Sequence, residues 1–187
     1  MKIYTPLLEE RSLNIVQGEY QVNNDPRTKL TTILGSCVAA CLWDSLAGLG
    51  GMNHFLLPGV DSRHPQPGGA AMRHGVHAME LLVNGLLQQG ADRRRLQAKL
   101  FGGARMIKGL TDIGDLNAAF AERFLRAEGI AIVGGSLRGN QGRRIQFWPV
   151  SGRARQVLIG LEQTSVRPER EFVPTRPSAQ AGALELF

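Results

Sequence analysis

The sequence holds only two cysteines in 187 residues, Cys37 and Cys41, four positions apart. Four residues of strand span about 13 Å, which is too far for a disulfide bridge. The chain therefore lacks the disulfide framework on which many small secreted domains depend. The simplest interpretation of Cys41 is a small apolar residue of the core.

Long apolar runs are absent as well. No run approaches the roughly 18 residues that a membrane-spanning helix requires. Residues 1–6 contain no apolar core of the kind found in a secretory signal. We therefore expect a cytoplasmic protein that does not insert into a membrane.

Aromatic residues make up only 6% of the chain, and none interrupts the arginine cluster at residues 93–95. Proteins that bind single-stranded nucleic acid combine a basic groove with aromatic side chains on which bases stack. The chain as a whole is nevertheless positively charged, because 22 Lys and Arg against 16 Asp and Glu give a formal net charge of +6. Such an excess favours nucleic acid or an acidic protein surface as a partner. A solvated basic surface explains it more simply, so a nucleic-acid binder stays a minor alternative.

Patterns for metals and nucleotides are also missing. His64, His74 and His77 have no cysteine or carboxylate at a spacing that would complete a ligand set. The glycine pairs at 50–51 and 102–103 lack the Walker and dinucleotide-binding contexts. Close approach of two backbone segments explains these pairs better. We expect neither a metal nor a cofactor.

What is present fits one α+β domain. Periodic apolar residues predict helices over residues 70–89 and 115–128. Strand-like runs precede and follow these helices, at residues 14–22, 38–43, 49–57, 96–101, 130–134, 144–150 and 155–161. Because the strands do not alternate with helices, largely antiparallel sheets are favoured over a doubly wound fold. The expected organisation is a flexible lead-in over 1–13, a domain over 14–162 and a flexible tail over 163–187.

Cys37 has the most informative surroundings in the sequence. The segment 44–48 has turn chemistry and separates two apolar runs, which predicts a β-hairpin. If Trp43 and Gly48 close a four-residue loop, Cys37 lies directly opposite His54, with Cβ atoms about 4.5–5.5 Å apart. A thiol beside an imidazole is the minimum requirement for a cysteine nucleophile.

Several further segments form an ordered set of motifs. They are residues 34–39 (LGSCVA), 50–58 (GGMNHFLLP), 98–104 (AKLFGGA), 113–117 (IGDLN) and 142–147 (GRRIQF). Together they resemble the CheD family, the chemoreceptor glutamine deamidases of bacterial chemotaxis. The resemblance implies a single α+β domain with a largely antiparallel β-sandwich core flanked by helices. It also implies similarity to the catalytic domain of the cytotoxic necrotizing factor toxins.

The same resemblance implies which residues form the site. The Cys, His and Thr of the family triad correspond to Cys37, His54 and Thr31. Thr31 lies six residues before the cysteine, as the family pattern requires, and Thr32 is directly adjacent to it. The neighbouring loops are expected to supply the oxyanion site, through Gly35, Ser36 and Asn53.

The implied activity is deamidation of protein glutamines. A Cys37 thiolate, stabilised by imidazolium, would attack the carboxamide, ammonia would leave, and water would then cleave the thioester. The expected partners are the cytoplasmic helical region of methyl-accepting chemotaxis receptors and a CheC-like phosphatase. Two alternatives use the same resemblance. One is a non-catalytic module that docks on receptors or on a CheC-like phosphatase, and the other is hydrolysis of glutamate methyl esters.

Overall fold

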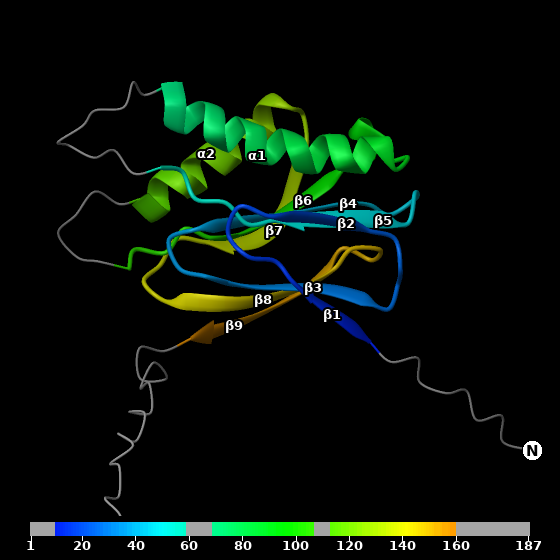
Figure 1. Cartoon of the computed structure of the whole chain (residues 1–187), viewed down its shortest axis with the longest axis horizontal. Helices are drawn as coiled ribbons and strands as arrows, with labels where there is room; N and C mark the ends of the chain where they lie inside the picture. The colour runs from blue at the N-terminus through cyan, green and yellow to red at the C-terminus, as the bar shows by residue number, and fades with distance from the viewer. Residues whose placement is uncertain (1–9, 59–68, 107–112, 160–187) are drawn as a thin grey trace, which may run out of the picture.

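The computed structural model describes residues 10–58, 69–106 and 113–159. Within these ranges the chain forms two β-sheets and two α-helices, stacked in three layers (Figure 1). The four-stranded sheet has the order β1-β3-β8-β9. Its strands are β1 (Arg11–Asn14), β3 (Thr28–Leu34), β8 (Gly142–Trp148) and β9 (Arg153–Ile159).

The five-stranded sheet has the order β2-β5-β4-β6-β7. Its strands are β2 (Tyr20–Asn23), β5 (Leu49–Asn53), β4 (Val38–Asp44), β6 (Gln97–Gly102) and β7 (Ala131–Leu137). Pairing is antiparallel except between β1 and β3 and between β6 and β7. The expected α+β class with largely antiparallel sheets is therefore confirmed.

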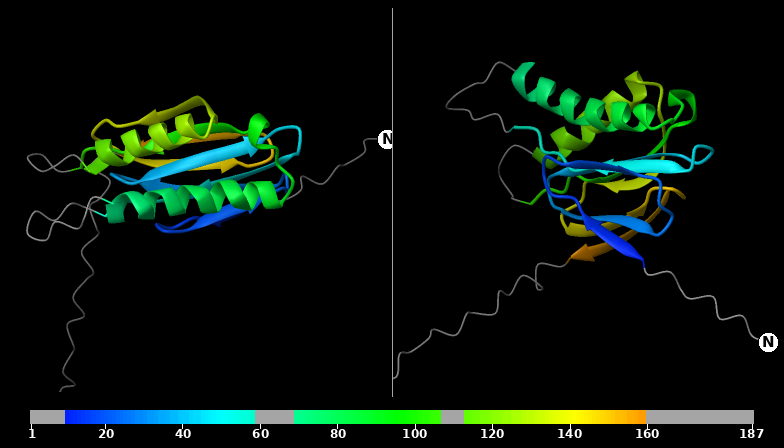
Figure 2. Two further views of the ribbon diagram at one scale, coloured as in Figure 1. Left: turned by 90° about the horizontal axis from the view of Figure 1, so that it is seen from above. Right: turned by 45° about the vertical axis from the view of Figure 1, so that its right-hand side comes forward.

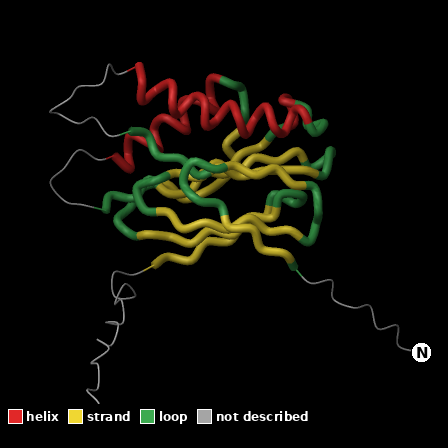
Figure 3. The backbone as a smooth tube through the Cα atoms, in the orientation of Figure 1, coloured by secondary structure: helices red, strands yellow, loops and turns green. Residues whose placement is uncertain are grey.

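Both helices cover the five-stranded sheet, on the face that points away from the other sheet (Figure 3). Seen from above, α1 (Gly69–Gln88) and α2 (Ile113–Ala127) lie side by side over it (Figure 2). A short 3₁₀ helix, η1 (Arg93–Arg95), follows α1. The helices thus flank the sandwich on one side only. No helix within the described residues has the length and hydropathy needed to cross a bilayer.

The layers enclose two apolar cores. One lies between the helices and the five-stranded sheet, and the other lies between the two sheets. Strand β4 contributes to both cores, and all seven of its residues are buried. A strand that is covered on both faces carries a continuous apolar run, which explains the sequence Val38-Ala39-Ala40-Cys41-Leu42-Trp43. Cys41 belongs to the core between the sheets, as expected.

Most predicted elements match the observed ones, but the predicted strand 49–57 ends at Asn53, and β3 (Thr28–Leu34) was not among the predicted strands. The predicted helices 70–89 and 115–128 each agree with the structure to within two residues at both ends. The predicted strand 14–22 is instead divided between β1 and β2, which belong to different sheets. The loop over residues 15–19 joins them, and β1 begins at Arg11, inside the expected lead-in. The expected tail, 163–187, lies outside the described residues.

Candidate active site

The hairpin of β4 and β5 has a different register from the predicted one. Trp43 pairs with Gly50 and Asp44 pairs with Leu49, so the predicted pairing of Trp43 with Gly48 is wrong. The turn explains the difference. The carbonyl of Asp44 accepts a hydrogen bond from the N–H of Gly48 at 3.0 Å. The Asp44 carboxylate also binds two N–H groups within the turn, which fixes the loop at residues 45–48.

The true register makes Cys37 and His54 diagonal neighbours instead of directly opposed residues. An isolated bridge pairs Val38 with Phe55, with hydrogen bonds of 3.0 and 2.9 Å. Diagonal neighbours across a pair of strands are typically about 7–8 Å apart. Because the register differs by two positions, the side chains stay on one face of the sheet. Cys37 packs against the core between the sheets, and His54 contacts Thr32 of the opposite sheet at 2.9 Å.

The imidazole of His54 is fixed in one orientation by β3 and the loop after β1. The hydroxyl of Thr32 donates to the carbonyl of Ile15 at 2.7 Å and lies 2.9 Å from Nδ1 of His54. Since the hydroxyl proton is used on Ile15, the Thr32 oxygen accepts from Nδ1–H. The carbonyl of Ile15, 3.5 Å from the same nitrogen, is a second acceptor. This network assigns the proton to Nδ1 and leaves a lone pair on Nε2.

Nε2 of His54 is buried and has no hydrogen-bond partner among the described residues. Buried polar atoms are nearly always paired, so an exception of this kind calls for a functional explanation. An unprotonated, unpartnered nitrogen can accept a proton from a nearby thiol or from a reacting water molecule. A ring in this state can act as a general base.

Burial favours the neutral forms of both Cys37 and His54. Desolvation raises the pKa of the Cys37 thiol above its ordinary value. Desolvation also lowers the pKa of His54, partly opposed by the hydrogen bond to Ile15. Both shifts disfavour the charged forms. Burial therefore favours the thiol and the imidazole over the thiolate and imidazolium of the sequence-based mechanism.

Thr31 and Thr32 point to opposite faces of β3. Thr32 is buried between the sheets, whereas Thr31 lines a shallow pocket of the outer face together with Lys29 and Arg144. Alternation along a strand requires this separation. In the structure it is therefore Thr32 that contacts the imidazole, whereas the family resemblance implied Thr31. The spacing of six residues before the cysteine points to Thr31, so it could not have found Thr32, which lies five residues before it.

The segment Gly35–Cys37 is held through its carbonyl groups. The carbonyl of Gly35 accepts from Ala104 N–H at 2.9 Å, and that of Cys37 accepts from Gly103 N–H at 2.8 Å. The carbonyl of Ser36 accepts from the amide of Asn117 at 3.1 Å. Within the described part of the chain, no hydrogen bond from the N–H groups of Ser36 or Cys37 to another residue is found. Such N–H groups beside a nucleophile can bind an oxyanion.

The glycine pair at 102–103 allows the backbone at the end of β6 to lie directly against the segment Gly35–Cys37. Gly102 has φ +106°, and a Cβ there would collide with the carbonyl of Cys37. A Cβ at Gly50 would likewise collide with backbone atoms. The expectation that these glycine pairs mark close backbone approach is confirmed.

Two asparagines near the site have structural tasks. Asn53 accepts from the N–H of Ala40 at 3.0 Å and donates to the carbonyl of Ala78 on α1 at 3.0 Å. Its amide faces the helices, so it does not lie where an oxyanion donor is needed. Asn117 accepts from Leu57 N–H at 2.7 Å while it binds Ser36. Asn117 belongs to one of the sequence motifs, but the sequence indicated no role for it. Its contact with Ser36 shows that it holds the segment before Cys37.

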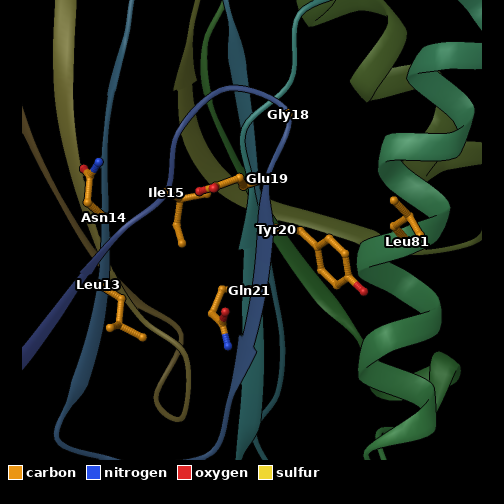
Figure 4. Close-up of a pocket in the computed structure, with 8 residues that line it drawn as sticks. All are labelled: Leu13, Asn14, Ile15, Gly18, Glu19, Tyr20, Gln21 and Leu81. Atoms are coloured by element: carbon orange, nitrogen blue, oxygen red, sulfur yellow. The ribbon is translucent and has the colours of Figure 1, made fainter.

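The β1–β2 loop, residues 15–19, lies over the histidine. Gly18 N–H donates to the carbonyl of His54 at 2.8 Å, and His54 N–H donates to the carbonyl of Glu19 at 3.0 Å. The loop also borders a surface pocket of about 470 Å³ that extends to Leu81 on α1 (Figure 4). Gln17, in the middle of the loop, accepts a hydrogen bond from the Cys37 thiol at 3.4 Å. Nothing in the sequence indicated this contact.

The arginine cluster of η1 is largely neutralised by carboxylates. Arg94 pairs with Asp92 at 2.9 Å, Arg95 pairs with buried Asp44 at 2.8 Å, and Arg93 pairs with Glu128. The positive charge of this segment is therefore used within the protein. This arrangement weakens the alternative of a nucleic-acid binder at that position.

Two stacked sheets that hold a thiol and a neutral imidazole on one inner face define a candidate cysteine hydrolase. A family profile described as CheD chemotactic sensory transduction matches residues 56–157. The chain is 65% identical over 178 residues to the probable chemoreceptor glutamine deamidase CheD of Acidiphilium cryptum, covering 95% of this chain and 94% of that protein. It is 58% identical over 170 residues to the protein of the same name from Rhizobium leguminosarum bv. trifolii, covering 89% and 92%. The chain belongs to the CheD family.

Among solved structures, the chain is similar to that of a Neisseria meningitidis protein of the DUF152 family. The TM-score is 0.43 and the sequence identity is 11%, over 70% of this chain and 63% of that one.

Proposed function

We propose that this protein is a cytoplasmic hydrolase that converts glutamines of chemoreceptors to glutamate, with Cys37 as the nucleophile. The proposal is supported by its close relatives, which are named chemoreceptor glutamine deamidases. Its main structural support is the His54 ring, which Thr32 orients and which keeps an unpartnered Nε2 on the face of the sheet shared with Cys37.

In the first half of the reaction, Nε2 of His54 takes the proton of the Cys37 thiol. The sulfur attacks the side-chain carbonyl carbon of the substrate glutamine, and the N–H groups of Ser36 and Cys37 bind the developing oxyanion. The imidazolium then returns its proton to the departing nitrogen, so that ammonia leaves and a thioester remains.

In the second half, Nε2 takes a proton from a water molecule, and the resulting hydroxide attacks the thioester. The carbon–sulfur bond breaks, glutamate is released, and the proton returns to sulfur. Thr32 keeps Nδ1 protonated throughout and so holds Nε2 as the working base, which is the role of the third member of a catalytic triad. We assign this role to Thr32 in place of Thr31.

The substrate glutamines in this proposal lie in the cytoplasmic helical region of methyl-accepting chemotaxis receptors. A CheC-like phosphatase is the proposed regulatory partner. Both assignments rest on membership of the CheD family.

The test uses purified protein and a receptor cytoplasmic fragment, with mass spectrometry of the fragment. Each converted glutamine gains about 1 Da, because an NH₂ group is exchanged for OH. Cys37→Ala is expected to abolish conversion. Cys41→Ala is the matched control, since Cys41 is fully buried and its pKa is strongly raised by burial. Full conversion by Cys37→Ala would refute the assignment of the nucleophile.

A further inference from the structure

A glutamine of this protein already lies against the nucleophile. The Cys37 thiol donates to the side-chain oxygen of Gln17 at 3.4 Å, and the thiol makes no other hydrogen bond to a side chain within the described residues. Gln17 is exposed, whereas Cys37 is half-buried. The group that contacts the sulfur is a glutamine carboxamide, the same group that the proposed reaction consumes.

The position of Gln17 is set by the backbone around it. Before it, Ile15 N–H donates to the carbonyl of Thr31 at 2.8 Å. After it, Gly18 and Glu19 bind the two backbone groups of His54, at 2.8 and 3.0 Å. Gly18 has φ +91°, a conformation that favours glycine and allows the chain to turn back there. Gln17 is thus held between two segments that are themselves bonded to the sheets that carry the site.

We propose that Gln17 is a self-modification site, at which Cys37 converts the protein's own Gln17 to a glutamate. This inference rests on the proposed function and extends it to a substrate within the same chain. The Cys37 sulfur forms a bond to the side-chain carbonyl carbon of Gln17, and the C–N bond breaks with release of ammonia, protonated through His54. Water then cleaves the thioester, so that one water is consumed and one ammonia is released for each glutamate formed at position 17.

Proximity favours this reaction. A group held beside a nucleophile in the same molecule reacts as if it were present at very high concentration. The exposure of Gln17 gives water access to the thioester and lets ammonia leave. The product also has a consequence for the site, because a carboxylate beside Cys37 disfavours the thiolate and slows further attack by the sulfur.

The experiment measures residue 17 directly. The full-length protein is synthesised in ¹⁸O-labelled water and digested with trypsin, and fragment ions locate any change within the peptide of residues 12–27. Conversion in labelled water adds about 3 Da at Gln17 because one ¹⁸O enters the new carboxylate. Gln21, exposed and in the same peptide, is the internal control. We expect Gln17 to be converted at least tenfold faster than Gln21.

Two variants test whether the reaction belongs to Cys37 and stays within one chain. Cys37→Ala is expected to keep Gln17 unchanged, whereas Cys41→Ala is expected to convert it as the natural sequence does. An isotope-labelled Cys37→Ala protein mixed with the active protein is expected to keep its own Gln17, since the contact is intramolecular. Conversion of Gln17 in isolated Cys37→Ala would overturn the inference, because spontaneous chemistry would then explain it.

A receptor fragment assayed in parallel separates this inference from the proposed function. If receptor glutamines are converted while Gln17 stays intact, self-modification is refuted and the proposed function stands. If Gln17 is converted while receptor glutamines are not, self-modification stands and the receptor assignment fails. If neither is converted, both are refuted.

Discussion

The β4–β5 hairpin carries buried polar side chains at both of its ends, and the two ends are completed differently. At the turn, the carboxylate of Asp44 is fully buried and accepts hydrogen bonds from Arg95 and from three backbone N–H groups, those of Leu46, Ala47 and Asp92. At the open end, His54 keeps one nitrogen without a partner among the described residues. A polar group that is buried and fully paired stabilises a fold, whereas an unpaired one is available for chemistry.

The pKa shifts follow the same division. Hydrogen bonds from Arg95 outweigh desolvation at Asp44 and lower its pKa to about 2, which keeps it charged. At Cys37 and His54 desolvation is the largest cause of the pKa shifts, and it favours the neutral form of both groups. One hairpin can thus combine a stabilising end with an end available for chemistry, because strong partners are supplied at only one of its ends.

The largest expected effect on activity comes from a substitution of His54, at the open end of the hairpin. His54→Gln should lower kcat/KM for receptor glutamine conversion by about 1,000-fold, which corresponds to about 4 kcal/mol of transition-state stabilisation. The free energy of unfolding should change by less than about 1 kcal/mol. Steady-state kinetics and urea unfolding measure the two quantities. Retained activity would show that another group acts as the base.

The next largest effect is on stability and comes from a substitution of Asp44, at the turn of the hairpin. Asp44→Asn should lower the free energy of unfolding by about 3 kcal/mol, because it removes the buried charge that pairs with Arg95 and accepts three backbone N–H groups. Asp25→Asn is the control, since the ion pair of Asp25 with Arg27 lies near the surface, where water screens the charges, and its loss should change stability much less. Neither change should lower kcat/KM more than about threefold. A large loss of activity in Asp44→Asn would contradict the division between the two ends.

The lowered pKa of Asp44 also predicts how stability depends on pH. A carboxylate whose pKa falls on folding stabilises the folded state above its unfolded pKa, near 3.8, and this contribution disappears as pH falls toward about 2. The contribution amounts to about 2 kcal/mol. Urea unfolding between about pH 5 and about pH 2 should show this loss in the natural sequence and a shallower one in Asp44→Asn.

A smaller effect distinguishes the two neighbouring threonines. Thr32→Val keeps the shape of the side chain but removes the hydroxyl that fixes the His54 tautomer, so kcat/KM should fall about 30-fold. Thr31→Val, on the opposite face of β3, should change kcat/KM less than about twofold. The reverse ranking would return the third catalytic role to Thr31.

The smallest effect is the position of the pH profile. Because the pKa of His54 is lowered from its ordinary value of 6.5, the base stays deprotonated at neutral pH, and the acidic limb of kcat/KM should lie below pH 6.5. Because the pKa of Cys37 is raised from its ordinary value of 9.0, alkylation by iodoacetamide should still accelerate above pH 9.0. A fast, pH-independent alkylation near about pH 6 would indicate a preformed ion pair instead.

Local patterns determined much of this protein from the sequence alone. The apolar periodicity of α1 and α2 fixed both helices to within two residues, because burial of one face requires that spacing. The two apolar runs around residues 44–48 predicted a hairpin. Cys37 and His54 were correctly placed on one face of it, because a shift of the register by two positions does not change the face. Glycine pairs marked close contacts correctly, since no other residue fits there.

The tertiary structure alone decided which partners meet across the two sheets. The contact of Thr32 with His54, the pairing of Arg95 with Asp44 and the contact of Gln17 with Cys37 join residues that are distant along the chain. No spacing rule links such residues, because their approach depends on how the sheets stack and where the β1–β2 loop crosses. Local periodicity therefore specifies each element and its buried face, whereas the protonation and the neighbours of the reactive groups arise only from packing between the layers.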